Sequence, residues 1–137
     1  MSLFSAFRIA GSGATAQSQR LNVVASNLAN ADSAAGPDGQ AYKARQVVFE
    51  SVAPEGASGG PQGVRVRQVT TDESAPRRLH DPKHPLADAQ GYVSLPNVNV
   101  ADEMVNMLSA ARSYENNIEV MNTAKSLLQK TLQLGNN

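Results

Sequence analysis

The residues best suited to chemistry lie together in the short stretch LHDPKHP (residues 79–85), which holds both histidines of this 137-residue chain. Two histidines and a carboxylate, here His80, Asp81 and His84, can coordinate a metal ion, and histidine is the usual proton carrier near neutral pH. The two prolines of the stretch disfavour the helix that would place both histidines on one face. We therefore predict a polar turn, with no catalytic, metal-binding or cofactor-binding residues.

Other kinds of chemistry find little support along the chain. Four arginines, at positions 65, 67, 77 and 78, could form a basic face, but acidic residues are interleaved with them. The chain has twelve basic and twelve acidic residues, so it lacks the basic excess typical of nucleic-acid binding. The sequence GPDGQ (residues 36–40) is typical of a turn, without the Lys-Ser/Thr pair of a phosphate loop. We predict no enzyme, no nucleic acid and no small-molecule substrate.

Composition limits the core and the cellular route. Hydrophobic residues make up 41% of the chain but aromatic residues only 4%, so a core would consist of Ala, Val and Leu. The chain has no cysteine, which suits a cytosolic protein or one exported unfolded. It contains no apolar run near the ~20 residues of a membrane span, and its start lacks the pattern of a cleaved secretory signal. We expect neither a membrane-spanning protein nor signal cleavage.

Proline divides the chain into three parts. All seven prolines lie between Pro37 and Pro96, and both flanks are free of them. A proline inside a helix costs about 3 kcal/mol, so this distribution predicts helix, non-helical segment, helix. We place an N-terminal assembly helix at 1–32, a β-rich middle segment at 33–98 and a C-terminal assembly helix at 99–137.

The N-terminal flank has apolar or small residues spaced alternately by four and three. Because Gly11 and Gly13 weaken this pattern, we expect the first dozen residues to fray, and Asn30 marks the predicted helix end. The series is Leu3, Phe7, Ala10, Ala14, Gln17, Leu21, Val24 and Leu28.

The C-terminal flank repeats the pattern more strongly, after a candidate N-cap at Asn99 and acidic residues that suit the first turn of a helix. A single helix of about 35 residues would be roughly 50 Å long, which is typical of coiled coils and assemblies. Gly135 closes it. The stripe consists of Met104, Met107, Ala111, Tyr114, Ile118, Met121, Lys125, Leu128 and Leu132.

The middle segment reads as strands and loops. The stretches QAYKARQVVFESV (residues 40–52) and GVRVRQVTT (residues 63–71) are β-prone, and the second alternates valine with arginine. A Gly/Pro-rich flexible connector spans 51–62. Beyond residue 71 prolines exclude regular structure except around Tyr92–Leu95. The predicted fold is therefore mainly α with a small β insert, its long terminal helices pairing as a coiled coil around a β-rich, Pro/Gly-containing middle.

Two features of the helices point to partners outside a simple helix hairpin. Asn22, Ser26 and Asn30 form a polar ridge beside the apolar stripe, although Asn is a poor helix former. Other apolar residues lie off the stripes, and a two-helix hairpin would leave them exposed. We therefore expect self- or co-assembly. The residues off the stripes are Val23, Val105, Leu108, Val120, Leu127 and Leu134.

Several long motifs resemble one protein family. The sequence AQSQRLNVVASNLANADS (16–33) is similar to the signature of bacterial flagellar axial proteins. Three further stretches resemble the proximal rod proteins of the flagellar basal body, the FlgC family. These are GPDGQAYKARQVVFE, HPLADAQGYVSLPNVNVADEMVNML and ARSYENNIEVMNTAKSLLQKTLQLG. The resemblance spans both ends and most of the middle, but not 51–62.

The resemblance implies a structural function. Proteins of this family are exported unfolded through the flagellar type III apparatus and polymerise in the periplasm into a hollow rod. That rod transmits torque and encloses the export channel. The implied partners are further copies, other rod proteins and the membrane-ring and export-gate adaptor components. The terminal helices would form the inner layer, and the middle segment would lie outside them.

Within that frame we hypothesise that Asn22, Asn27 and Asn30 hydrogen-bond to neighbouring chains and fix the helical register. Two alternatives stay open: another flagellar axial component, or a soluble coiled-coil adaptor that binds a partner helix. The predicted assembly residues are Leu21, Asn22, Val24, Ser26, Asn27, Leu28, Asn30, Met104, Met107, Ala111, Tyr114, Asn117, Ile118, Met121, Leu128 and Leu132.

Overall fold

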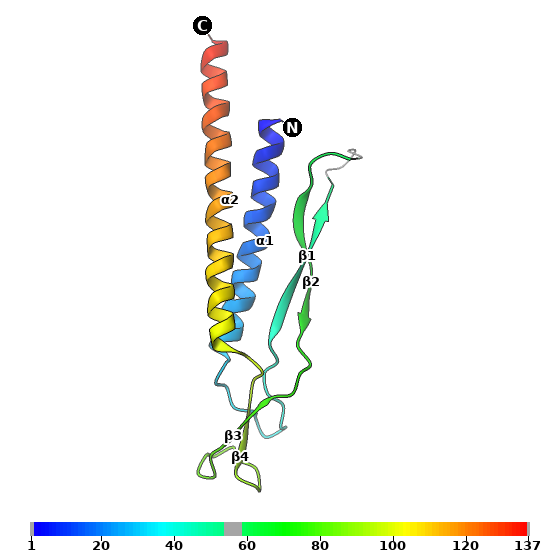
Figure 1. Ribbon diagram of the computed structural model, residues 1–137, viewed down its shortest axis with the longest axis vertical. Helices are drawn as coiled ribbons and strands as arrows, with labels where there is room; N and C mark the ends of the chain where they lie inside the picture. The colour runs from blue at the N-terminus through cyan, green and yellow to red at the C-terminus, as the bar shows by residue number, and fades with distance from the viewer. Residues whose placement is uncertain (1, 54–58, 137) are drawn as a thin grey trace.

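Two long helices of unequal length lie side by side and run in opposite directions (Figure 1). The computed structural model describes residues 2–53 and 59–136. Helix α1 spans Leu3–Ala29 with 27 residues, and α2 spans Val100–Gly135 with 36. Both ends of the chain lie at the same end of the helix pair, where α2 extends beyond the start of α1 (Figure 1). The prediction of two long helices flanking a small β region is confirmed.

Helix α1 is continuous through both of its glycines, so the predicted fraying of the first dozen residues is wrong. It begins at an N-cap, where Ser2 Oγ accepts a hydrogen bond of 3.0 Å from the Ser5 N–H. It ends at Asn30, the C-cap, where the sequence placed its end. The helix is stabilised through packing on α2, which outweighs the cost of glycine in a helix interior.

Small residues let the two helices approach closely. A Cβ atom at Gly13 would lie 2.7 Å from Asn117 Oδ1, so only glycine fits without a shift of that side chain. Ala10, Ala14 and Ala16 are buried along the same part of α1. The glycine and alanine positions that weakened the predicted stripe are therefore what allows the contact. The helices pair as predicted, and their supercoiling as a coiled coil stays a prediction.

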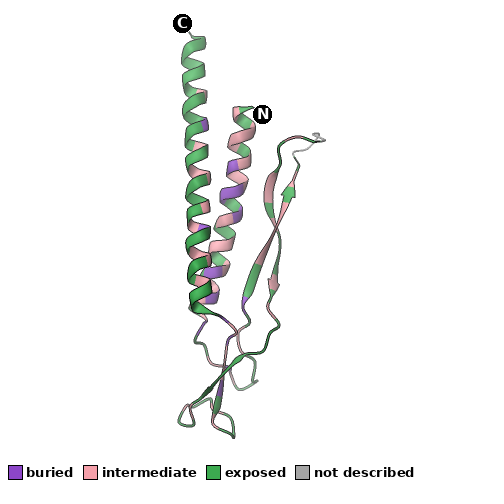
Figure 2. Cartoon of the chain, in the orientation of Figure 1, coloured by how far each residue is buried: buried purple, intermediate pink, exposed green. Residues whose placement is uncertain are grey.

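Helix α2 begins where its capping residues predict. The Asn99 side chain accepts a hydrogen bond of 3.2 Å from the Asp102 N–H, and Asp102 and Glu103 occupy the first turn. The buried residues of this long helix are two alanines, Ala110 and Ala124. Most of the remaining helix surface is exposed (Figure 2). A helix of this length is thus covered along one narrow face.

A long β-hairpin lies beside α1. Strand β1 (Arg45–Val52) pairs antiparallel with β2 (Gly63–Thr71), with a register shift between Val48 and Phe49. Ser12 Oγ accepts a hydrogen bond of 3.1 Å from the Val64 N–H, which fixes the far end of the hairpin to α1. The predicted connector at 51–62 is shorter than expected, because β1 continues to Val52, and residues 54–58 lie outside the described part.

A second, smaller sheet lies at the opposite end from the chain termini (Figure 1). Strand β4 (Tyr92–Leu95) was predicted, but its partner β3 (Arg77–His80) was not. The two strands are antiparallel, with Arg77 opposite Leu95 and His80 opposite Tyr92. The four residues of β3 fit between two prolines. The prediction missed this strand because it treated the whole proline-rich stretch as irregular, whereas pairing with β4 stabilises the strand.

The core is built from small aliphatic residues. All buried hydrophobic side chains of the described residues are alanine or valine. A cluster of Ala31, Ala44 and Val98, with Tyr42 packed against it, lies where the helices meet the β segments. The expectation that leucine would contribute to the core is wrong, because an elongated helix pair has little interior and leaves leucines half-buried or exposed.

Candidate assembly surface

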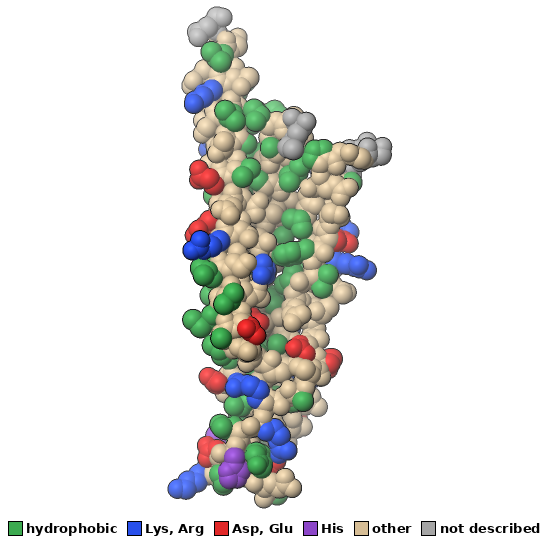
Figure 3. Space-filling model, viewed as in Figure 1, with side chains coloured by type: hydrophobic (Ala, Val, Ile, Leu, Met, Phe, Trp, Pro, Cys, Tyr) green, Lys and Arg blue, Asp and Glu red, His purple; other side chains and the backbone are tan. Residues whose placement is uncertain are grey.

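The surface of the helices carries many exposed hydrophobic side chains. Large hydrophobic side chains along α2 and at the ends of the helices are exposed. Figure 3 shows hydrophobic side chains along the outer edge of α2 and also between the elements. Isolated exposed hydrophobic residues are ordinary, but series of them along one helix mark interaction sites. Those on the helices are Phe4, Val100, Met104, Val105, Leu108, Tyr114, Val120, Leu127, Leu132 and Leu134.

The first group lies at the start of α2. Met104, Val105 and Leu108 are 60%, 69% and 57% exposed. Residues three and four apart share a helix face, so these three side chains form one patch. Met107 and Ala110, on the other side of the same turns, are the residues that pack inward. We call Met104, Val105 and Leu108 the base patch.

The second group lies where the chain begins and ends. Phe4, Leu132 and Leu134 are 69%, 69% and 76% exposed. Leu132 continues the row of α2 residues that faces α1, but α1 has already ended at this level (Figure 1). The face of α2 that packs on α1 therefore continues past the start of α1, where it has no helix to cover it. Leu132 and Leu134 are two positions apart and point to different sides of α2, so these residues do not form one continuous surface. We call the three the end residues.

The structure divides the predicted assembly residues into packed and free positions. Val24 and Asn27 are buried, whereas Asn22, Met104, Tyr114 and Leu132 are exposed. The others are half-buried: Leu21, Ser26, Leu28, Asn30, Met107, Ala111, Asn117, Ile118, Met121 and Leu128. The residues placed off the stripes by the sequence account for most of the exposed apolar surface of α2. The sequence identified these residues because their helical spacing places them outside the two stripes.

The structure shows Asn27 bonded within its own chain, whereas the prediction placed its hydrogen bonds on a neighbouring chain. Its side chain is fully buried, and all four of its hydrogen bonds lie within the chain. Oδ1 accepts from the Tyr42 hydroxyl at 2.8 Å and from the Arg45 N–H at 2.9 Å. Nδ2 donates to the Arg45 carbonyl at 2.8 Å and to Glu103 Oε2 at 3.2 Å. This saturates the amide, so a bond to a neighbouring chain is excluded in this conformation.

The other amides behave differently from one another. Asn30 caps α1, and its Nδ2 donates to the Ser26 carbonyl at 2.9 Å. Asn117 Nδ2 donates to the Ser113 carbonyl at 2.8 Å within α2. Asn22 is exposed on α1, and for this residue the bond to a neighbouring chain stays a prediction.

The histidine stretch is a hydrogen-bonded turn. His84 Nδ1 accepts from the Leu86 N–H at 3.0 Å, and Asp81 Oδ1 accepts from the Lys83 N–H at 3.3 Å. The His80 ring packs edge-on against Tyr92, with the ring centroids 4.9 Å apart. Within residues 2–53 and 59–136, no group of three His, Cys, Asp or Glu residues is arranged to hold a metal ion. In the same residues no helix has the length and apolar character needed to cross a membrane.

A carboxylate close to this turn, that of Asp88, is held by backbone hydrogen bonds. Asp88 Oδ1 accepts from the N–H groups of Tyr92 and Gln90, each at 2.9 Å. The hydrogen bond from the Tyr92 backbone N–H lowers the pKa of Asp88 below its ordinary value, with further help from Gln90 and Arg78. A carboxylate held ionised in this way closes the loop between β3 and β4 and is unsuited to donating a proton.

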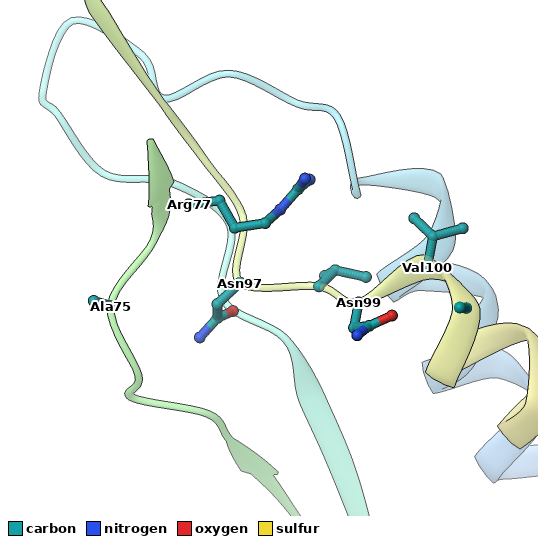
Figure 4. Close-up of a pocket in the computed structure, with 7 residues that line it drawn as sticks. Ala75, Arg77, Asn97, Asn99 and Val100 are labelled. Carbon is teal, nitrogen blue, oxygen red and sulfur yellow. The ribbon is translucent and has the colours of Figure 1, made fainter. Parts of the chain in front are cut away.

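An open pocket of about 470 Å³ lies beside the start of α2 (Figure 4). Arg77 extends along it, but its guanidinium is already used: Nε donates to the Pro96 carbonyl at 3.0 Å and Nη2 to the Ala31 carbonyl at 2.9 Å. The arginine therefore joins the end of α1 to the segment that leads into α2. The pocket is a junction between elements and not an assembled reaction site.

Comparisons with known proteins agree with the architecture. A family model described as flagella basal body rod protein matches residues 7–37. A second, described as the C-terminal part of the flagellar basal body rod FlgEFG proteins, matches residues 89–134. The two matches cover most of α1 and nearly all of α2, the elements that carry the end residues and the base patch.

Individual relatives match the chain over nearly its full length. It is 59% identical over 135 residues to the flagellar basal-body rod protein FlgC of Yersinia enterocolitica, covering 98% of this chain and 99% of the relative. The protein of the same name from Escherichia coli O157:H7 is 58% identical with the same coverage. That of Borreliella burgdorferi is 38% identical over 149 residues, covering 98% of each chain.

Proposed function

This chain belongs to the FlgC family and is a structural subunit of the flagellar basal-body rod, and we propose that it polymerises with other rod proteins into a hollow periplasmic shaft. That shaft would transmit motor torque to the hook and filament and enclose the export channel. Its neighbours would be further copies, other rod subunits and the membrane-ring and export-gate adaptor components. Export through the flagellar type III apparatus, without signal cleavage, accords with the absence of cysteine.

The observation that carries the proposal is the one-sided packing of α2. A helix of 36 residues buries two alanines, while its base patch is more than half exposed. An isolated subunit would leave this apolar surface in water, at a cost of about 25 cal/mol per Å². Burial against neighbouring subunits removes that cost, so the surface favours an assembled state over a free one.

The division into parts extends the same proposal. The N-terminal and C-terminal helices would form the inner layer of the shaft, and the segment 33–98 would face outward. Exposed members of the predicted set, Asn22, Met104, Tyr114 and Leu132, would contact other subunits directly. The half-buried members would act indirectly, by holding α1 and α2 together as one unit.

The experiment that tests the function replaces the native gene in its host. Leu108→Glu puts a charge into the base patch, and Ser109→Glu puts the same charge on the next, exposed position as the matched control. We expect Leu108→Glu to abolish swimming in soft agar and to leave basal bodies without complete rods in electron micrographs. Ser109→Glu should preserve both swimming and complete rods, since the new charge would stay in water and would not be buried in a subunit contact.

Two results would contradict the proposal. Normal swimming from Leu108→Glu, at normal subunit levels by immunoblot, would exclude the base patch as an assembly contact. Normal flagella in cells that lack the gene altogether would exclude the rod function itself, provided that no second copy of the gene is present.

A further inference from the structure

The base of the β1–β2 hairpin is held by two asparagines from opposite sides. Asn27 belongs to the last turns of α1, and Asn97 lies in the segment that leads from β4 into α2 (Figure 4). Between them they bind the main chain where β1 begins and where β2 ends. The hairpin itself is a two-stranded sheet, a structure that is marginal in water without further packing.

Asn27 supplies the first half of this attachment. Its amide bonds both main-chain groups of Arg45, the first residue of β1, at 2.9 Å and 2.8 Å. The same amide donates to Glu103 in the first turns of α2. A single side chain therefore joins α1, β1 and α2, and it does so at full burial, where an unpaired amide is costly.

Asn97 supplies the second half. Its Oδ1 accepts from the Ala44 N–H at 2.8 Å, one residue before β1. Its Nδ2 donates to the Asp72 carbonyl at 2.9 Å, one residue after β2, and to the Ser74 carbonyl at 3.0 Å. The Asp72 N–H in turn donates to the Ala44 carbonyl at 2.8 Å, so both strands are closed at the same level.

We infer that Asn27 and Asn97 are positioning residues that fix the direction of the hairpin along α1. Backbone groups at the open end of a two-stranded sheet have no third strand to bond, and the two amides take the place of that strand. The direction matters because the hairpin meets α1 again at its far end, at Ser12 and Val64. The fixed base and the far contact together make the hairpin a rigid part of the subunit.

The far contact provides a direct reporter. The chain has no cysteine, so a pair can be introduced without interference. A Cβ atom at Gly63 would lie 3.4 Å from Ser12 Cβ, near the roughly 3.8 Å that separates the Cβ atoms of a disulfide. In the Ser12→Cys/Gly63→Cys chain, expressed full length in its host, copper–phenanthroline oxidation should form an intrachain bond. The bond is visible as a faster band on a non-reducing gel.

Asn27 and Asn97, which we call the clamp, are then substituted in this reporter chain. We expect Asn27→Ala and Asn97→Ala each to lower the cross-linked fraction of the surviving chain at least threefold. Asn27→Asp combined with Glu103→Gln should recover part of the loss shown by Asn27→Asp alone. In that pair the new amide at position 103 donates to the new carboxylate at position 27, which restores the bond to α2.

Two controls separate positioning from general stability. Val24→Ala removes a side chain that is 1% exposed on the same helix and takes no part in the hydrogen bonds of Asn27 and Asn97. It should lower the amount of protein but not the cross-linked fraction, and the exposed Asn22→Ala should change neither. Unchanged cross-linking in both clamp variants, or an equal loss in Val24→Ala, would overturn the inference. The readout is independent of rod assembly, so either result leaves the proposed function to its own test.

Discussion

The contact between Gly13 and Asn117 allows a test of the helix pairing within α1 itself. Two interior glycines lie close together on this helix, but they face different surroundings. A Cβ at Gly13 would meet the Asn117 side chain at 2.7–2.9 Å, whereas one at Gly11 would lie 3.7 Å from Met121 Cε, an ordinary contact. The perturbation is the same substitution, glycine to alanine, at each position in turn.

The magnitudes follow from two terms. Alanine in place of glycine in a helix interior gains about 1 kcal/mol, and this gain is common to both positions. Overpacking a close contact costs about 1–3 kcal/mol, and this cost applies only at Gly13. Gly11→Ala should therefore stabilise the chain by up to about 1 kcal/mol. Gly13→Ala should be about 1–3 kcal/mol less stable than Gly11→Ala, because the helix term cancels in the comparison.

The assay is urea unfolding of the purified full-length chain, followed by circular dichroism at 222 nm. A third variant, Gly13→Ala with Asn117→Ala, removes the obstructing amide and should return the stability to that of Gly11→Ala. Equal stabilisation by both single substitutions would refute the reasoning. It would mean that α1 and α2 are not packed at Gly13 in the free subunit and that the seam forms only in an assembly.

Three further predictions test local features. Asn99→Ala removes the N-cap of α2 and should cost about 1 kcal/mol in thermal unfolding, whereas Asn99→Asp should cost little. The lowered pKa of Asp88 makes its ionised form favour the fold above the ordinary value of 3.8, a contribution that is lost as the pH falls through the lower folded-state pKa. An NMR titration of the Tyr92 amide should therefore have its midpoint below 3.8, and a midpoint at or above 3.8 would contradict this. Val24→Ala should lower the free energy of unfolding by about 2 kcal/mol, while Val105→Ala, 69% exposed, should stay within about 0.5 kcal/mol by the same measurement.

The helices were predictable from the sequence because their signals are local. The Asn99 cap and the absence of proline after Pro96 define the start of α2, and Asn30 marks the end of α1. The glycines of α1 misled the prediction for a physical reason. Helix propensity alone opposes glycine, and only a second helix passing close to Gly13 turns its missing side chain into an advantage.

The candidate surface was predictable only in part. Helical spacing identified the apolar residues that a two-helix hairpin leaves exposed, Val105 and Leu108 among them. Spacing could not decide which residues of the stripes face α1, because that depends on the rotation of each helix about its axis. Met104 and Tyr114, predicted within the seam, are 60% and 37% exposed, whereas Ala110 is fully buried.

The sequence by itself determined the two long helices, the β-rich segment between them and the membership of the FlgC family. These rest on patterns within short stretches of chain. Only the tertiary structure decided what Asn27 does. Its partners, Tyr42, Arg45 and Glu103, lie 15, 18 and 76 residues away along the chain, so no local pattern reports them. A side chain that could have served a neighbouring subunit is instead saturated within its own, because folding brings three distant segments to one amide.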